Sequence, residues 1–129
     1  MTRKTYLGHG GTMIDSIIEK LVEMGAFPAR KKTKTETIRV VSNMLEAIKY
    51  EYNGRLPRWE LKTFVTRFAN QSKFSERQIY RYINELKALG FLEDIVDVGT
   101  QKHYIVLSKR FGSRMLALYR DYNKWLGEV

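Results

Sequence analysis

The 129-residue sequence contains no cysteine and no long apolar run. The lack of cysteine excludes a disulfide framework, a thiolate zinc site and a thiol nucleophile. A bilayer-spanning helix needs roughly 18–20 apolar residues in succession, and no stretch of this chain approaches that length. The basic start, Met1–Lys4, is not followed by the apolar segment of a secretory signal. We therefore expect a cytoplasmic protein that does not associate with membranes.

Residues suited to catalysis or metal binding are scarce as well. The chain has two histidines, His9 and His103, and the glycine-rich stretch around His9 lacks a Walker lysine and a preceding strand. The acidic residues of 93–97 fall in a strand-like run, where alternation sends neighbouring side chains to opposite faces. We therefore expect no catalytic site, no metal and no cofactor, and we predict that the protein is not an enzyme.

Acidic residues are fewer than basic ones, with 14 Asp and Glu against 23 Lys and Arg and a net charge of +9. Residues 1–35 contain seven basic and three acidic side chains, and residues 36–90 contain ten and six, so each segment carries +4. Residues 91–129, with six basic and five acidic side chains, carry only +1. Such an excess attracts polyanions at long range, and nucleic acid is a better candidate than an anionic membrane.

Hydrophobic periodicity predicts three helices in the first 70 residues. Thr12 is a suitable N-cap, and apolar residues then recur at helical spacing until Gly25, covering half of the helical wheel. The stretch 28–35 is basic and has no periodic apolar residues, so we interpret it as a linker. A second helix is expected at 36–52, ended by Asn-Gly, and a third at 58–70, preceded by Leu-Pro.

The clearest local signal comes next. Ser75 is followed three residues later by glutamine, a capping box that opens a helix over 76–89, and a glycine then stops it. The strand-like runs 91–98 and 102–107 flank a Gly-Thr-Gln turn and predict a β-hairpin. A last helix is expected at 113–126. The whole is a mainly α fold with a small β-hairpin, in the α+β class.

Residues 75–92 read SERQIYRYINELKALGFL. The order is serine, a polar pair, an apolar residue, arginine further on, paired apolar residues, Leu-Gly and an apolar strand. This pattern resembles the winged helix-turn-helix family, the DNA-binding module of many bacterial and archaeal regulators. The resemblance covers 36–107 and implies a recognition helix at 75–89 followed by a wing. We accordingly divide the chain into a leader, amphipathic helix and basic linker (1–35), a winged helix-turn-helix domain (36–107) and a C-terminal helix (108–129).

The chemistry of this helix points to DNA without the resemblance. With the apolar residues turned inward, the opposite face is centred on Arg77, Arg81 and Asn84, with Tyr80 to one side and Gln78 at its boundary. Arginine, asparagine and glutamine can bond base edges in the major groove or phosphate oxygens. The first two turns of such a helix usually reach the bases, so the two arginines and Gln78 are the leading candidates.

Phosphate contacts are expected from residues around the same helix. Ser75 would place the helix N-terminus beside a phosphate, and Lys73 and Arg58 lie near the starts of the last two core helices. The resemblance implies a basic wing that enters the minor groove, but here Lys102 and His103 are the sole basic residues at the tip and acidic residues precede them. We therefore expect Lys102 to contact a phosphate only.

The linker itself carries four basic residues, namely Arg30, Lys31, Lys32 and Lys34. It is either an arm that follows phosphates or enters a neighbouring minor groove, or a solvated linker. Its place just before the first core helix favours contact with DNA.

The two terminal helices are candidate protein contacts. An exposed apolar stripe on the last helix would form a costly patch, so we expect a homodimer contact, with a fourth core helix as the alternative. The N-terminal helix is expected to pack on this dimer helix or to recruit another protein. The predicted dimer residues are Met115, Leu118, Tyr119, Tyr122, Trp125 and Leu126.

Together these features predict a double-stranded DNA-binding protein of the nucleoid, with a sequence-specific dimeric transcriptional regulator as the first hypothesis. The second is a DNA-organising, partition or replication protein of a mobile element that coats DNA with low specificity. The third is a winged helix that acts purely as a protein adaptor.

Overall fold

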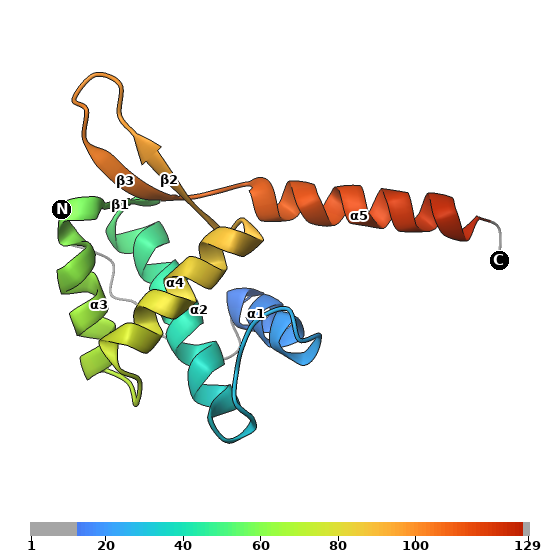
Figure 1. The fold of residues 1–129 in the computed structure, drawn as a ribbon, viewed down its shortest axis with the longest axis horizontal. Coiled ribbons are helices and arrows are strands. Elements are labelled where there is room, and N and C mark those ends of the chain that lie inside the picture. Colours follow the sequence, from blue (N-terminus) through green and yellow to red (C-terminus); the bar gives the residue numbers. More distant parts are fainter. Residues whose placement is uncertain (1–12, 128–129) are drawn as a thin grey trace.

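The computed structural model describes residues 13–127. It is mainly helical with a small antiparallel sheet, which confirms the expected α+β class (Figure 1). The helices are α1 (Met13–Glu23), α2 (Lys34–Glu51), α3 (Leu61–Asn70), α4 (Glu76–Leu89) and α5 (Arg110–Leu126), with 3-10 turns η1 (Lys31–Thr33) and η2 (Arg58–Glu60) ahead of α2 and α3.

The sheet contains the predicted hairpin and one strand that the sequence did not predict. The hairpin strands are β2 (Leu92–Val96) and β3 (His103–Leu107), and β1 (Arg55–Pro57) pairs with the other side of β3, so the order is β1-β3-β2. We interpreted the Leu-Pro pair of β1 as the entry to a helix. The strand is only three residues long and exists because Leu56 pairs with Ile105, a partner far along the chain. A proline is tolerated at the end of such an edge strand.

One hydrophobic core joins the helices to the inner face of the sheet. Each of α2, α3 and α4 turns its apolar residues toward it at the spacing expected for amphipathic helices. Burial of these side chains is the main favourable term in folding. Its largest fully buried members are Ile18, Phe27, Val41, Met44, Ile48, Leu56, Phe64, Val65, Ile79, Tyr82, Leu86 and Ile105.

The N-terminal helix belongs to this core. Ile18 and Leu21 of α1 and the following Phe27 are buried in the same cluster as the α2 residues. The apolar face of α1, for which we expected a dimer helix or another protein, is therefore covered by its own domain. The N-cap predicted at Thr12 lies outside the described residues. The basic stretch that we interpreted as a linker is largely helical, since η1 begins at Lys31 and α2 at Lys34.

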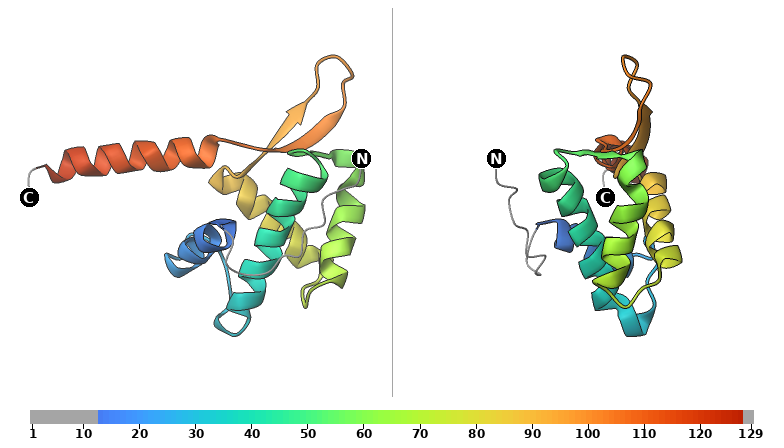
Figure 2. Two further views of the ribbon diagram at one scale, coloured as in Figure 1. Left: turned by 180° about the vertical axis from the view of Figure 1, so that it is seen from behind. Right: turned by 90° about the vertical axis from the view of Figure 1, so that its left-hand side faces the viewer.

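The C-terminal helix leaves the domain. Figure 1 and Figure 2 show α5 extending away from the other helices as a single rod. It begins at Arg110, three residues earlier than predicted, and is exposed from Gly112 onward. The alternative that it packs as a fourth core helix is therefore wrong, because only Phe111 at its start contacts the core.

Candidate nucleic-acid interface

The boundaries of α4 are set by local contacts that the sequence predicted. The hydroxyl of Ser75 accepts a hydrogen bond from the backbone N–H of Gln78 at 3.2 Å. Gly90 ends the helix in the left-handed conformation, with φ of 99°, and its N–H donates to the carbonyl of Leu86. An N-cap of this kind contributes about 1 kcal/mol to helix stability. Both ends of the helix are thereby fixed.

The face of α4 opposite the core presents the predicted side chains to solvent. Arg77, Arg81 and Asn84 are exposed, and each lies about one turn further along the helix than the one before it. Gln78 is half-buried at the boundary, as expected, and Tyr80 is also half-buried, with its ring packed against the core. Within residues 13–127, neither arginine has a hydrogen bond or ion pair. Both guanidinium groups are therefore available for base edges or phosphates.

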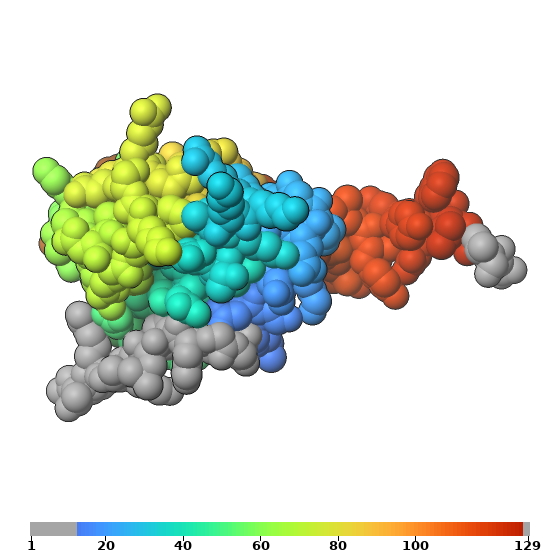
Figure 3. All heavy atoms as spheres, turned by 90° about the horizontal axis from the view of Figure 1, so that it is seen from below, coloured from blue at the N-terminus to red at the C-terminus, as the bar shows by residue number. Residues whose placement is uncertain are grey.

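A hollow next to the start of α4 brings the basic stretch to the same surface. It has a volume of about 650 Å³ and is lined by Arg30 and Thr33 on one side and by Lys73, Ser75 and Arg81 on the other. The buried ring of Tyr82 also lines it. In Figure 3, side chains around residues 30–34 (cyan) and side chains of α4 (yellow) project from the same edge of the molecule. The structure thus places Arg30 and the recognition-helix candidates around one concave, cationic surface.

A buried hydrogen bond holds this hollow together. The hydroxyls of Thr37 in α2 and Tyr82 in α4 lie 3.0 Å apart, and both side chains are almost fully buried. The Tyr82 ring contacts Phe27, which precedes the basic stretch, and Phe74, which precedes α4. The first turn of α2 and the second turn of α4 are therefore joined through the Tyr82 side chain.

Two of the predicted phosphate-binding lysines have nearby carboxylates. Lys73 lies 3.5 Å from Glu36, and Lys34 lies 3.4 Å from Glu23. The pKa of Glu36 is lowered mainly by a hydrogen bond from its own backbone N–H at the start of α2, and then by Lys73. Exposed ion pairs of this kind contribute little and exchange readily. These lysines remain able to turn toward a polyanion, as do the exposed Lys31 and Lys32 of η1.

Arg58 is placed apart from this group. It lies in η2 beside the sheet, at the opposite end of α3 from Lys73. Its guanidinium is 3.6 Å from Asp94, which also pairs with Lys87 of α4 at 3.1 Å. The structure therefore groups Arg58 with the hairpin, and not with the start of α4.

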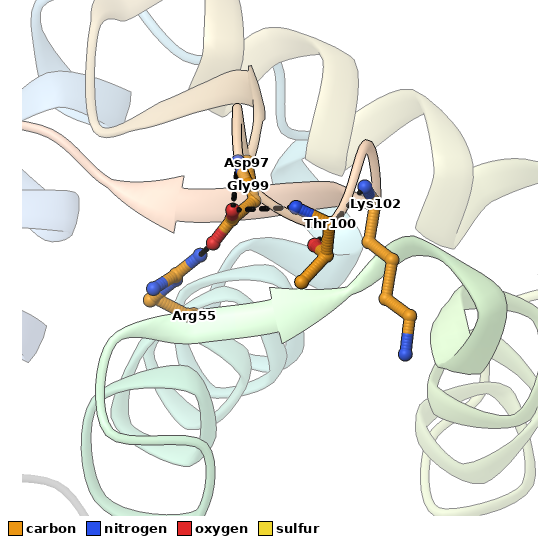
Figure 4. A network of polar contacts seen from close by, with 5 residues as sticks. All are labelled: Arg55, Asp97, Gly99, Thr100 and Lys102. Carbon is orange, nitrogen blue, oxygen red and sulfur yellow. Dashed lines mark hydrogen bonds and ion pairs between the residues drawn. The ribbon is translucent and has the colours of Figure 1, made fainter.

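The tip of the hairpin is held by Asp97. Its Oδ1 accepts hydrogen bonds from the backbone N–H groups of Gly99 at 2.9 Å and Thr100 at 3.1 Å (Figure 4). Its other oxygen lies 3.4 Å from Arg55 of β1. These backbone hydrogen bonds, followed by Arg55, lower the pKa of Asp97. The acidic residue that counted against a DNA-binding wing therefore has a structural task in the turn.

Lys102 lies over an aromatic side chain that sequence reasoning missed. Its Nζ is 5.2 Å from the centroid of Trp59, a side chain with 58% of its surface exposed. Tyr104 lies 5.5 Å from Trp59, and the guanidinium of Arg55 lies 4.2 Å from the ring of Tyr104. Trp59 precedes the apolar spacing of α3, a signal that it is not a core residue. The ammonium group of Lys102 therefore lies beside η2, the turn that also contains Arg58.

In Figure 2 (right), α4 lies along one side of the domain, with the β2–β3 hairpin above it and the segment around residues 30–34 below it. The predicted contacts thus fall into two cationic groups that flank one helix. The lower group is Arg30, Lys31, Lys32, Lys34 and Lys73, and the upper group is Arg58 and Lys102.

The predicted dimer residues on α5 are all exposed in the single chain. Tyr119 has 65% and Trp125 77% of its surface exposed. Leu116, which the sequence analysis did not include, is exposed beside them. Contiguous exposed apolar surface is uncommon on monomeric proteins and usually marks an interaction site. The remaining predicted members, Met115, Leu118, Tyr122 and Leu126, are exposed as well.

Across residues 13–127, histidine and carboxylate side chains do not gather into a group that could hold a metal ion. The helices of the same region are too short or too polar to cross a membrane. Compared with known proteins, the chain matches no family model, no curated protein and no solved structure.

Proposed function

We propose that the protein is a non-enzymatic, double-stranded DNA-binding protein of the winged helix type, which inserts α4 into the major groove. The observation that carries the proposal is that Arg77 and Arg81 are exposed and have no hydrogen-bond or ion-pair partner among residues 13–127, with Arg81 lining a concave surface that further cations also line. The order α2-β1-α3-α4-β2-β3 supports the winged helix, because the resemblance implies three helices followed by a hairpin. The net charge of +9 supports a polyanionic partner.

In this arrangement the surface divides into two functions. Arg77, Gln78 and Arg81 occupy the first two turns of α4, the part of a recognition helix that reaches base edges. Each bidentate contact contributes about 1–3 kcal/mol of discrimination between bases. The cations of the lower group lie beside the helix and bind phosphates, which position the helix without reading sequence.

Binding by fluorescence anisotropy, across a salt series, tests the proposal with a random duplex and a selected best site. We expect a clear preference for the selected site and a steep loss of affinity with salt. The five cations of the lower group, Arg30, Lys31, Lys32, Lys34 and Lys73, would give a slope of about −4.5 per protomer, at roughly −0.9 for each phosphate contact.

Single-residue variants separate the contribution of base contacts to binding affinity from the contribution of the overall positive charge. We expect Arg77→Ala and Arg81→Ala each to weaken binding to the selected site by about 5- to 150-fold, following the energy of one bidentate contact. Lys124→Ala removes one positive charge near the far end of α5 and serves as the control, for which we expect a change within about twofold. Unchanged affinity and specificity in the double Arg77, Arg81 variant would refute the recognition-helix assignment.

A DNA-coating protein of low specificity is the second candidate. The balance of side chains favours it. The five cations of the lower group, which we propose contact phosphates only, outnumber Arg77, Gln78 and Arg81, the side chains proposed to contact bases. Steep salt dependence without preference for the selected site would support this function over a sequence-specific regulator. Absence of binding at low salt would favour a protein adaptor.

We further propose that α5 forms a homodimer contact with α5 of a second copy. The stripe is apolar and runs along a helix that its own domain leaves uncovered, so a symmetric pairing would bury it on both chains at once. Because Tyr122 and Trp125 are exposed in the single chain, Tyr122→Glu with Trp125→Glu leaves the core untouched. We expect sedimentation to give a dimer for the parent chain and a monomer with unchanged melting temperature for the variant. A variant that stays dimeric would exclude this contact.

A further inference from the structure

The joint between α4 and α5 has an unusually close backbone approach. Gly90, which ends α4, accepts a hydrogen bond at its carbonyl from the N–H of Phe111 in the first turn of α5, at 3.0 Å. A Cβ atom at Gly90 would lie 2.8 Å from the nitrogen of Phe111, closer than real Cβ contacts. The start of α5 is therefore seated directly on the end of α4, although 20 residues of chain separate them.

Side chains of α5 and of Phe91, which follows α4, close the joint further. The rings of Phe91 and Phe111 are stacked, with centroids 4.2 Å apart and planes inclined by 19°. Arg114, one turn into α5, donates from Nη1 to the carbonyl of Ala88 at 2.7 Å. That carbonyl lies in the last turn of α4, where carbonyls have no partner within the helix. A charged donor at this position also interacts favourably with the negative end of the helix dipole.

The connection between β3 and α5 is short, and hydrogen bonds tie it to the segment that contains Phe91 and Glu93. Only Ser108 and Lys109 connect β3 to α5. The N–H of Ser108 donates to the carbonyl of Phe91 at 2.9 Å, and its hydroxyl donates to Glu93 of β2 at 3.1 Å. The same carboxylate group pairs with Arg110 at 2.9 Å. A two-residue connection held in this way has no free length in which to act as a hinge.

These contacts fix the direction of α5 relative to α4 within one chain. Figure 1 shows the consequence, since α5 continues outward from the end of α4 as an extended rod. At 1.5 Å per residue, the 17 residues of α5 reach about 25 Å from the domain. In a dimer joined through α5, the separation and rotation of the two α4 helices would then be set by the joint.

We infer that this joint, formed by Gly90, Phe91, Phe111 and Arg114, is the determinant of half-site spacing, so that the dimer binds two DNA half-sites at one separation only. The inference rests on the proposed function, in which α4 reads DNA and α5 dimerises. A shift of one base pair rotates a half-site by about 34° around the duplex, at 10–10.5 base pairs per turn. A rigid joint cannot follow that rotation, whereas a flexible one can.

The test compares duplexes carrying one selected half-site or two half-sites whose separation changes in steps of one base pair. For the parent chain we expect one preferred separation, where affinity exceeds that for a single half-site by about 10²-fold or more, because both half-sites are engaged together. At other separations we expect affinity to fall to the single half-site value.

The variant Phe111→Ala with Arg114→Ala loosens the joint without touching the proposed DNA surface, and Arg114→Ala alone is the milder form because its side chain is exposed. Arg120→Ala removes one charge from α5 outside the joint and is the control. We expect the joint variants to keep single half-site affinity and to lose the preference among separations. A sharp preference that survives in the double variant would overturn the inference.

A measurement without DNA separates this inference from the proposed function. Because the chain has no cysteine, Asn84→Cys in α4 and Asn123→Cys in α5 provide two unique sites for spin labels. In chains diluted with unlabelled protein, we expect a narrow distance distribution for the parent and a broad one for the joint variant. A broad distribution in the parent would overturn the rigid joint. A failure of the parent to bind a single half-site would instead refute the proposed function.

Discussion

The buried hydrogen bond between Thr37 and Tyr82 allows a quantitative test of how α4 is held on α2. The two hydroxyls lie 3.0 Å apart, and Thr37 is fully buried. Thr37→Val keeps the side-chain volume but leaves the Tyr82 hydroxyl buried without its partner. A buried polar group left unpaired costs about 1–3 kcal/mol. We expect the free energy of unfolding to fall by that amount.

Removing the Tyr82 hydroxyl should lower the free energy of unfolding less than removing the Thr37 hydroxyl. In Tyr82→Phe the Tyr82 hydroxyl is removed, and the hydroxyl that remains on Thr37 can donate to the carbonyl of Thr33, the N-cap residue of α2. We expect a loss of about 1 kcal/mol. In the double variant no buried hydroxyl is left unpaired, so its cost should be close to that of Tyr82→Phe alone. The two changes are therefore expected to be non-additive, with a coupling equal to the cost of Thr37→Val, about 1–3 kcal/mol.

Urea unfolding followed by far-ultraviolet circular dichroism is the appropriate assay, because the chain is mainly helical and its tryptophans, Trp59 and Trp125, are already exposed in the folded state. Thr63→Val, at an exposed position of α3, is the control and should change stability by less than about 0.5 kcal/mol. The reasoning would be refuted if Thr37→Val cost no more than Tyr82→Phe, or if the two costs simply added.

Three further predictions concern local structure. Ser75→Ala removes the cap of α4 and should lower the free energy of unfolding by about 1 kcal/mol, while Ser75→Asp should retain it, as measured by urea unfolding. Gly90→Ala should cost more than the roughly 1–2 kcal/mol of a left-handed alanine, because its Cβ also meets Phe111; an equal or smaller loss would contradict the close approach. The lowered pKa of Asp97 means that its contribution is present above the ordinary aspartate pKa of about 3.9 and is lost as pH falls through the lower folded value. The Thr100 amide should therefore keep its hydrogen-bonded NMR shift until the pH is below that ordinary value, and an earlier change would contradict the assignment.

Local signals along the chain predicted α4 most accurately. Ser75 and Gly90 act through bonds to residues three or four positions away, so the ends of the helix follow from neighbours in sequence. The exposure of Arg77 and Arg81 follows in the same way, because the apolar residues of the helix must face the core. The predicted hairpin strands were also confirmed, each with ends within two residues of the prediction.

Contacts between segments far apart in the sequence decided the features of the fold and of the candidate site that local signals did not predict. The strand β1 depends on Ile105, and Lys102 lies over Trp59, which is 43 residues earlier in the numbering. The basic stretch reaches the start of α4 because the Tyr82 ring contacts Phe27 and the Tyr82 hydroxyl is hydrogen-bonded to that of Thr37. No periodicity or spacing records such pairings, since they arise from how preformed elements fit around one core.

The sequence by itself therefore determined the class of the fold, the exposed polar face of α4 and the apolar stripe of α5, because each depends on spacing within one element. Only the tertiary structure decided that α1 is a core helix, that Arg30 and Arg81 line one hollow, and that α5 stands away from the domain with its first turn against the end of α4. These depend on packing between elements, which short-range propensities do not specify.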